Sequence, residues 1–155
     1  MPATKLSHVS IQTGDLEESL VFYTDVLGME RIPSPVFRFP TAWLRVGDPE
    51  LHLFESGTPA PRLQHFGLTV DDFEDVYVKS KALGIQDRDS WCDQPYELPD
   101  GSVQMYLRDL AGNLVEIDWP DVSTLDRSVV TETRKLADNV PQTRKATRAT
   151  LFLDG

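Results

Sequence analysis

In this 155-residue chain, the residues best suited to bind a metal ion or to catalyse a reaction are the histidines. His8 and His65 hold the same place in two segments that read as copies of one another. The offset between the copies is 57 residues, both at the histidine and at the aspartate that follows it, Asp15 or Asp72. An imidazole can hold a metal ion. A duplicated unit that presents one twice therefore suggests a site built between the two copies.

Each copy predicts the same order of structural elements. An alternating strand leads to an amphipathic helix that begins at an aspartate and ends at a glycine, and short strands follow. The pattern predicts an α+β protein with a mainly antiparallel sheet and helices on one face. The predicted strands are 6–13, 31–32, 36–39, 41–46 and 50–55, then 63–70, 85–89, 102–108 and 114–119, and the predicted helices are 16–27 and 72–83.

Strand alternation places all three histidines and one glutamate on a single face. Successive side chains of a strand point to opposite faces. The apolar neighbours of His8 and His65 therefore face the core, and the histidines face the other way. Glu116 lies between a valine and an isoleucine in the last strand, and His52 takes its place in the first copy. If each of these four side chains were equally likely to lie on either face, all four would share one face about one time in eight.

The run from Asp109 to Glu116, DLAGNLVE, is a further motif. Together with His8, His65 and the pattern of residues 22–30, it resembles the vicinal oxygen chelate superfamily. This superfamily includes glyoxalase I, methylmalonyl-CoA epimerase, fosfomycin-modifying enzymes, extradiol dioxygenases and bleomycin-binding proteins. The resemblance implies an open, cup-shaped sheet of two βαβββ modules. The predicted boundaries are 1–119 for the domain, about 5–56 and 62–119 for its modules, and 120–155 for a partly helical extension.

The resemblance also implies a divalent metal held by the first and last strands of both modules. Carried over by position, the ligands would be His8, His52, His65 and Glu116. Imidazole and carboxylate ligands suit Zn²⁺, Ni²⁺, Fe²⁺, Co²⁺ or Mn²⁺ and disfavour Mg²⁺ or Ca²⁺. An octahedral ion would keep two positions for a substrate with adjacent oxygens and act as a Lewis acid. A tetrahedral Zn²⁺ would be closed and structural.

His52 bears on the type of reaction. Extradiol dioxygenases resemble the chain at Tyr106, Asp109 and Glu116 but leave the position of His52 free, so a ring-cleaving dioxygenase is the second enzyme hypothesis. Glyoxalase I and the epimerase fill that position with a proton carrier, a role that histidine can take. We therefore expect a lyase, isomerase or epimerase with Glu116, His52 and Tyr106 as catalytic residues. The alternative class is a non-catalytic module that binds a drug or metabolite.

Four more residues are predicted to contact the substrate. Gln104 and Arg108 share a face of strand 102–108 with Tyr106, and Trp43 and Arg45 share a face of strand 41–46. A guanidinium group is suited to orient an anionic or oxygenated group of a substrate. The sequence thus predicts a small-molecule site lined by both modules.

Composition and charge limit the partners and the location. The net charge is −10, and residues 1–119 carry −11, which disfavours nucleic acid. No apolar run approaches the roughly 20 residues of a membrane span. The N-terminus lacks the apolar core of a signal peptide, and the single cysteine, Cys92, fits a reducing compartment, so we expect a cytoplasmic protein. Because dimers are common in the resembling family, we expect a homodimer.

Residues 120–155 lie outside the resemblance. The spacing of Leu125, Val129 and Leu136 predicts a helix over 122–139 that ends before Pro141. The extension carries six basic and five acidic side chains. This balance suits contact with an acidic neighbour, either the body of the same chain or a second subunit.

Overall fold

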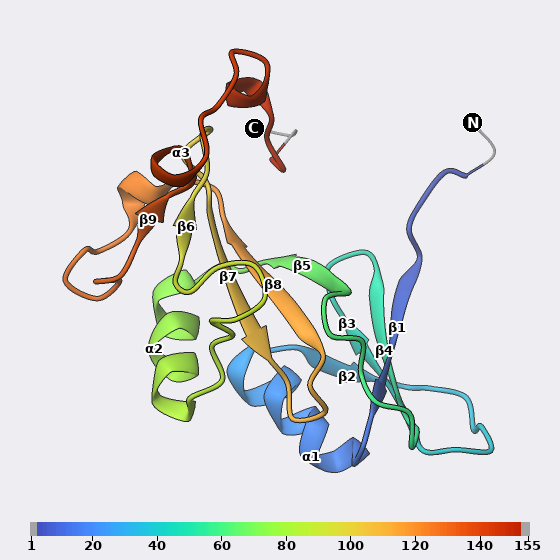
Figure 1. Cartoon of the computed structure of the whole chain (residues 1–155). Helices are drawn as coiled ribbons and strands as arrows, with labels where there is room; N and C mark the ends of the chain where they lie inside the picture. Colours follow the sequence, from blue (N-terminus) through green and yellow to red (C-terminus); the bar gives the residue numbers. More distant parts are fainter. Residues whose placement is uncertain (1–2, 153–155) are drawn as a thin grey trace. The chain divides into compact units, whose positions relative to one another are not determined.

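The structure, a computed structural model, describes residues 3–152 (Figure 1). It confirms the duplication and the α+β class, because a strand, a helix and three strands occur twice in order. The first copy comprises β1 (His8–Thr13), α1 (Leu16–Val21), its π-helical continuation η1 (Phe22–Val26), β2 (Glu30–Ile32), β3 (Thr41–Arg45) and β4 (Glu50–Glu55). The second comprises β5 (His65–Thr69), α2 (Phe73–Leu83), β6 (Tyr96–Glu97), β7 (Val103–Arg108) and β8 (Leu114–Trp119).

The chain divides into two compact units, each with one open sheet. Unit 1 holds the described residues up to Gln64 together with Arg108–Asn113. Unit 2 holds His65–Leu107 and the described residues from Leu114 onward. The strand order is β1-β4-β3-β2 in one sheet and β5-β8-β7-β6, followed by a short β9, in the other. The two copies therefore share one topology, as expected for a duplicated module.

The first and last strands of each copy lie side by side and run parallel. Ser10 of β1 lies opposite His52 of β4, and Gly67 of β5 lies opposite Glu116 of β8. β3 pairs antiparallel with β2 and β4, and β6 pairs antiparallel with β7. The predicted, mainly antiparallel sheets thus also contain one parallel pair per copy. This pair joins segments that are far apart in the sequence.

Alternating burial separates a core face from an open face in these strands. Leu51 and Leu53 of β4 are 1% and 0% exposed, whereas His52 between them is partly exposed. In β5, Leu68 is buried and His65 is exposed. Because apolar side chains are driven out of water, the leucines select which face each histidine occupies.

Aspartates begin both long helices, as predicted. The carboxylates of Asp15 and Asp72 each accept a hydrogen bond of 2.9 Å from the backbone N–H three residues on. Gly84 ends α2 in the left-handed conformation, with φ at 67°. The helix predicted over 16–27 changes from α to π geometry at Phe22. None of the helices within the described residues is long and apolar enough to cross a bilayer.

Two predicted strands are wrong. Residues 33–40 form a loop, so 36–39 is not a strand. The three prolines of this loop lack the N–H groups that a sheet requires. The strand predicted over 85–89 is reduced to a single bridge between Gln86 and Leu107. In the second sheet, β6 takes the place that β2 holds in the first.

The continuous helix predicted over 122–139 is also wrong. Asp121 and Asp126 explain the breaks, because each carboxylate accepts from the serine N–H two residues on and holds the chain in a turn. Leu125 and Val130 are buried, so the irregular segment still packs through apolar side chains. The extension contains η2 (Val122–Thr124), β9 (Arg134–Lys135), α3 (Leu136–Asn139) and η3 (Ala146–Arg148).

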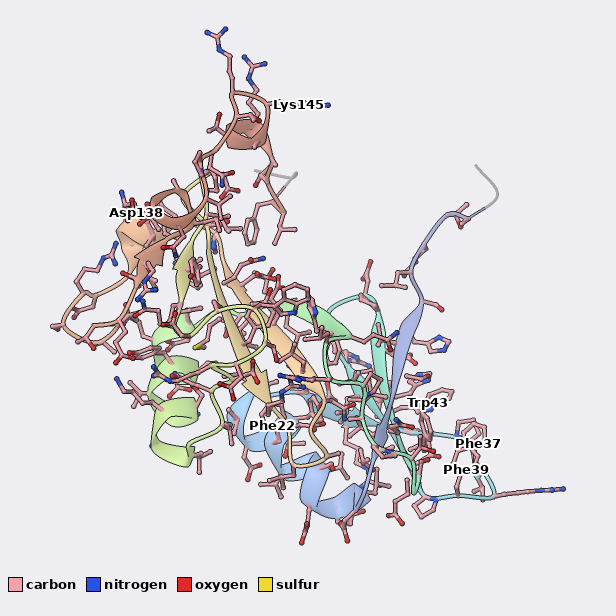
Figure 2. The ribbon with its side chains drawn as sticks, viewed as in Figure 1. Phe22, Phe37, Phe39, Trp43, Asp138 and Lys145 are labelled. Carbon is pink, nitrogen blue, oxygen red and sulfur yellow. The ribbon has the colours of Figure 1, made fainter. Side chains whose placement is uncertain are left out.

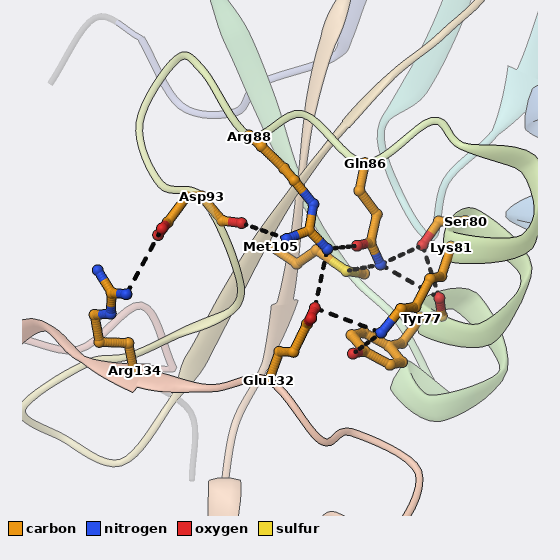
Figure 3. Close-up of polar contacts among 9 residues, drawn as sticks. All are labelled: Tyr77, Ser80, Lys81, Gln86, Arg88, Asp93, Met105, Glu132 and Arg134. Atoms are coloured by element: carbon orange, nitrogen blue, oxygen red, sulfur yellow. Dashed lines mark hydrogen bonds and ion pairs between the residues drawn. The ribbon is translucent and has the colours of Figure 1, made fainter.

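Polar contacts hold the extension against the rest of unit 2 (Figure 3). Glu132 accepts a hydrogen bond of 2.9 Å from Arg88 and pairs with Lys81 of α2 at 3.5 Å. Arg134 of β9 pairs with Asp93 at 3.7 Å, and β9 runs parallel to β6. These side chains are partly exposed, so each pair contributes little free energy. Together they determine where the extension lies on unit 2.

Tyr23 offers a test of the polar core of unit 1. Its side chain is fully buried, and its hydroxyl donates to Asp109 Oδ2 at 2.8 Å. Burial and this carboxylate raise its pKa well above the usual range. We expect Tyr23→Phe to lower the free energy of unfolding by about 1–3 kcal/mol, because Asp109 would lose a buried donor. Urea unfolding followed by circular dichroism measures the change.

Tyr96→Phe is the matched control for this measurement. The Tyr96 hydroxyl accepts from Asn139 at 2.9 Å in a surface contact. We expect its loss to change stability by less than about 0.5 kcal/mol. Equal losses in the two variants would contradict the role given to Tyr23.

Candidate functional site

His65 and Glu116 lie together in unit 2. They stand on adjacent parallel strands, β5 and β8, and project onto the same face. His65 Nε2 is 3.1 Å from Glu116 Oε2. Strand parity predicted the shared face, and the pairing of the two strands brings these atoms within bonding distance.

Three polar groups surround the Glu116 carboxylate, which is only 7% exposed. Besides His65, Tyr106 donates its hydroxyl to Oε2 at 2.5 Å, and Gln104 donates Nε2 to Oε1 at 2.6 Å. Burial, and then this carboxylate, raises the pKa of Tyr106 well above its usual range, so the hydroxyl keeps its proton. A buried carboxylate is costly without partners. The three groups therefore hold Glu116 in one orientation.

Asp118 contributes a second buried acidic side chain to this cluster, and it was not among the predicted site residues. It is 5% exposed, and its Oδ1 has no hydrogen-bond partner among the described residues. Burial, and then the charge of Glu116, raises its pKa to about 8. A Cβ at Gly67 would lie 2.9 Å from Asp118 Oδ2, so the glycine makes room for it. The signal was the parity that Asp118 shares with Glu116 in strand 114–119.

Two aromatic rings pack against His65, and a buried thiol packs against one of them. The His65 ring makes edge contacts with Tyr106 and Trp91, at centroid distances of 5.4 and 5.8 Å. Cys92 packs with Tyr106 in a small apolar cluster, and its burial raises the pKa of the thiol to about 12. The raised pKa keeps the Cys92 thiol protonated at neutral pH.

His8 and His52 form the corresponding pair in unit 1, in a different setting. Their rings stack at a centroid distance of 4.4 Å, and Trp43 stacks on His52 at 4.1 Å. Because β4 lies between β1 and β3, the His52 ring is enclosed between the other two. His52 Nε2 is 2.8 Å from Glu50 Oε2, and His8 Nδ1 is 3.0 Å from Ser7 Oγ. Each imidazole is thereby oriented through one nitrogen.

The two arginines predicted to contact substrate have other partners in unit 1. Arg45 pairs with Glu30 at 3.4 Å on the surface. Arg108 donates to the main-chain carbonyls of Arg62 and Gly112, at 2.7 and 2.8 Å. Arg108 therefore helps to hold a turn. The substrate contacts of both arginines stay predictions.

The predicted metal ligands are divided equally between the two units. His8 and His52 belong to unit 1, and His65 and Glu116 to unit 2. Within residues 3–152 no group of three or more His, Cys, Asp or Glu side chains is arranged to hold a metal ion. The complete set of four ligands stays a prediction, as do the module boundaries.

A sequence model of the Glyoxalase/Bleomycin resistance protein/Dioxygenase superfamily matches residues 5–117. The chain belongs to this superfamily. The match spans both copies, in agreement with the resemblance carried by the motif residues, and it ends at the extension. A comparison with curated protein sequences gives no significant match.

Several solved structures are similar to the chain in fold. Lactoylglutathione lyase from Agrobacterium tumefaciens is 24% identical, with coverage of 81% of this chain and 100% of that chain and a TM-score of 0.58. Oxidase ChaP-H2 is 24% identical, with coverages of 74% and 92% and a TM-score of 0.61. A mutant of the fosfomycin resistance protein FosX from Listeria monocytogenes, complexed with Mn(II) and 1S,2S-dihydroxypropylphosphonic acid, is 15% identical, with coverages of 78% and 95% and a TM-score of 0.64. At these identities the likeness shows the fold alone.

Cys92 provides a test of burial in the site. With its pKa raised to about 12, the thiol is almost wholly protonated at pH 8, and only the thiolate reacts with alkylating agents. We expect iodoacetamide at pH 8 to label the folded protein at least about a hundredfold more slowly than the protein in urea. Mass spectrometry measures the rate. Rapid labelling of protein with intact circular dichroism would contradict the buried placement.

Gly67→Ala tests the space around Asp118. We expect a loss of about 1–3 kcal/mol in the free energy of unfolding, because the buried Asp118 carboxylate must move to accept the new Cβ. Gly57→Ala is the control, since nothing lies within 4 Å of a Cβ at that position. Thermal unfolding of both variants gives the comparison. A loss of the same size in Gly57→Ala would contradict the steric explanation.

Proposed function

We propose that this chain is a metal-dependent enzyme that binds a small substrate through two adjacent oxygens. We favour a lyase, isomerase or epimerase reaction, in which a proton is transferred at a position next to a carbonyl group of the substrate. The buried Glu116 carboxylate, oriented by Tyr106 and Gln104 with His65 beside it, is the observation that carries the proposal. Burial of a carboxylate is unfavourable, and a cation bound against it would offset that cost.

His65 and Glu116 fit two neighbouring ligands of one transition-metal ion. His65 Nε2 and Glu116 Oε2 lie 3.1 Å apart on one face of the sheet, so both atoms could contact the same ion. An imidazole with a carboxylate suits Zn²⁺, Ni²⁺, Fe²⁺, Co²⁺ or Mn²⁺ better than Mg²⁺ or Ca²⁺. We propose His8 and His52 as the other two ligands.

The side chains of this chain would control protons and orientation. When bound, the metal would stabilise negative charge on a substrate oxygen as a Lewis acid. Tyr106 keeps its proton and directs it at Glu116 Oε2, while Gln104 holds the other carboxylate oxygen. His52 lies 2.8 Å from the Glu50 carboxylate, a distance that permits proton exchange between them.

A second candidate is a non-catalytic module that sequesters a drug or metabolite. The setting of His52 favours it, because a ring stacked between His8 and Trp43 is less free to reorient during a reaction. Ligand binding that survives EDTA would support this candidate. A ring-cleaving dioxygenase is the less favoured enzyme, because His52 fills the position that such enzymes leave free.

Metal content tests the proposal directly. We expect protein purified without a histidine tag and reconstituted with each of the five metals to hold about one ion per chain by elemental analysis. His65→Ala and Glu116→Gln should weaken binding by at least about tenfold, because the first removes a ligand and the second removes the negative charge of another. Glu132→Gln, which alters the surface contacts of the extension, is the matched control and should keep the metal. Wild-type protein that binds none of the five metals would overturn the proposal.

The same measurement tests the contribution of unit 1. We expect His8→Ala and His52→Ala to weaken metal binding as well. Full metal occupancy in both would remove unit 1 from the ligand set. The proposal also includes a cytoplasmic homodimer that binds neither nucleic acid nor membranes, and light scattering of the purified protein tests the dimer.

A further inference from the structure

Six aromatic rings of the described residues form a continuous strip on unit 1. His8 stacks on His52, and His52 stacks on Trp43 with an angle of 4° between the planes. Beyond Trp43 the strip continues through Phe37, at 6.5 Å, and Phe39 to Phe54. Figure 2 shows Trp43, Phe37 and Phe39 close together. We call this set, His8, His52, Trp43, Phe37, Phe39 and Phe54, the aromatic strip.

The outer part of the strip is exposed although it is apolar. Phe37 is 44% exposed, Phe39 is 47% exposed, and Val36 beside them is fully exposed. The loop that carries them lines a pocket of about 340 Å³, formed by residues 34–41. A cluster of exposed apolar side chains on a protein of net charge −10 points to binding.

Prolines and hydrogen bonds restrict the conformation of this loop. Its three prolines restrict the backbone. The carbonyl of Pro40 accepts from the Glu55 N–H at 2.9 Å, and Thr41 Oγ1 donates to the Phe39 carbonyl at 3.2 Å. The Phe37 and Phe39 rings lie within 7° of parallel. Rings ordered in advance bind a flat ligand at a lower entropic cost.

The dimensions favour a small ligand over a protein partner. A stable protein interface covers about 800 Å² on each partner, so a protein partner would have to contact much more of unit 1 than the two phenylalanine rings. Pockets for small molecules begin at about 300 Å³, and this pocket falls in that range. The rings present flat faces, which suit stacking with a planar ring better than contact with a flexible alkyl chain.

We propose that the aromatic strip binds a planar aromatic ring system of the ligand by stacking. One end of the strip consists of His52 and His8, two of the proposed metal ligands. Resting on the proposed function, the inference narrows the substrate to a planar aromatic compound with two adjacent oxygens. Stacking on Phe37 and Phe39 would direct the oxygen-bearing edge toward the histidines.

Calorimetry with a matched pair of probes tests the inference. 3-Hydroxy-2-naphthoate is planar and carries adjacent hydroxyl and carboxylate oxygens, whereas its fully saturated decahydro analogue keeps the oxygens and loses the flat rings. We expect the naphthoate to bind the full-length protein about tenfold or more tightly than the analogue. Phe37→Ala/Phe39→Ala should weaken naphthoate binding about tenfold. Val78→Ala/Leu83→Ala, which trims exposed side chains of α2, should leave it unchanged.

Fluorescence tests where the probe binds. Trp91→Phe/Trp119→Phe leaves Trp43 as the only tryptophan. We expect the naphthoate to quench its emission in this background, and the quenching to require higher probe concentrations once Phe37 and Phe39 are also alanine. Phe37 and Phe39 are half exposed, so circular dichroism should show these variants folded.

The outcomes separate this inference from the proposed function. Equal affinity for the two probes, or no loss in Phe37→Ala/Phe39→Ala, would overturn the aromatic strip as a ligand site while metal binding stands. Tight naphthoate binding by protein that takes up no metal would leave the strip in place and remove the metal-dependent function. Wild-type metal content in Phe37→Ala/Phe39→Ala is expected in either case.

Discussion

The parallel pairing of the first strand of each copy with its last is the constraint on which the rest depends. A parallel pair needs a long connection, and the helix and two intervening strands supply it in both copies. The pairing puts His65 beside Glu116 in one unit and His8 beside His52 in the other. Without this pairing, the two side chains of each pair, which are far apart in the sequence, would not come into contact.

The duplicated scaffold has diverged in what it does with the equivalent positions. In unit 2, Glu116 lies among polar groups of β5 and β7 and is nearly inaccessible. In unit 1, His52 lies between two rings and continues into an aromatic strip. One copy thus provides an oriented charge and the other a flat apolar surface.

Several ionisable side chains are buried around Glu116. Asp118 adds a second carboxylate that has little access to water, and only the missing side chain of Gly67 makes space for it. Tyr106 and Cys92 stay protonated under the same burial. Such a group of buried polar residues is expensive to maintain in a fold. Its presence agrees better with a functional centre than with a purely structural core.

The sequence by itself determined the duplication, most of the strands and the face that each chemical side chain occupies, because these depend on local periodicity and on helix caps such as Asp15 and Asp72. It missed the loop character of 36–39, where prolines outweigh the apolar pattern, and it placed a helix over 122–139 that Asp121 and Asp126 break up.

Only the tertiary structure decided which side chains meet. Asp118 had the right parity, yet its approach to Gly67 depends on the register of β5 against β8. The aromatic strip likewise depends on β4 lying between β1 and β3. Periodicity tells which way a side chain points, but strand order and register determine its neighbours.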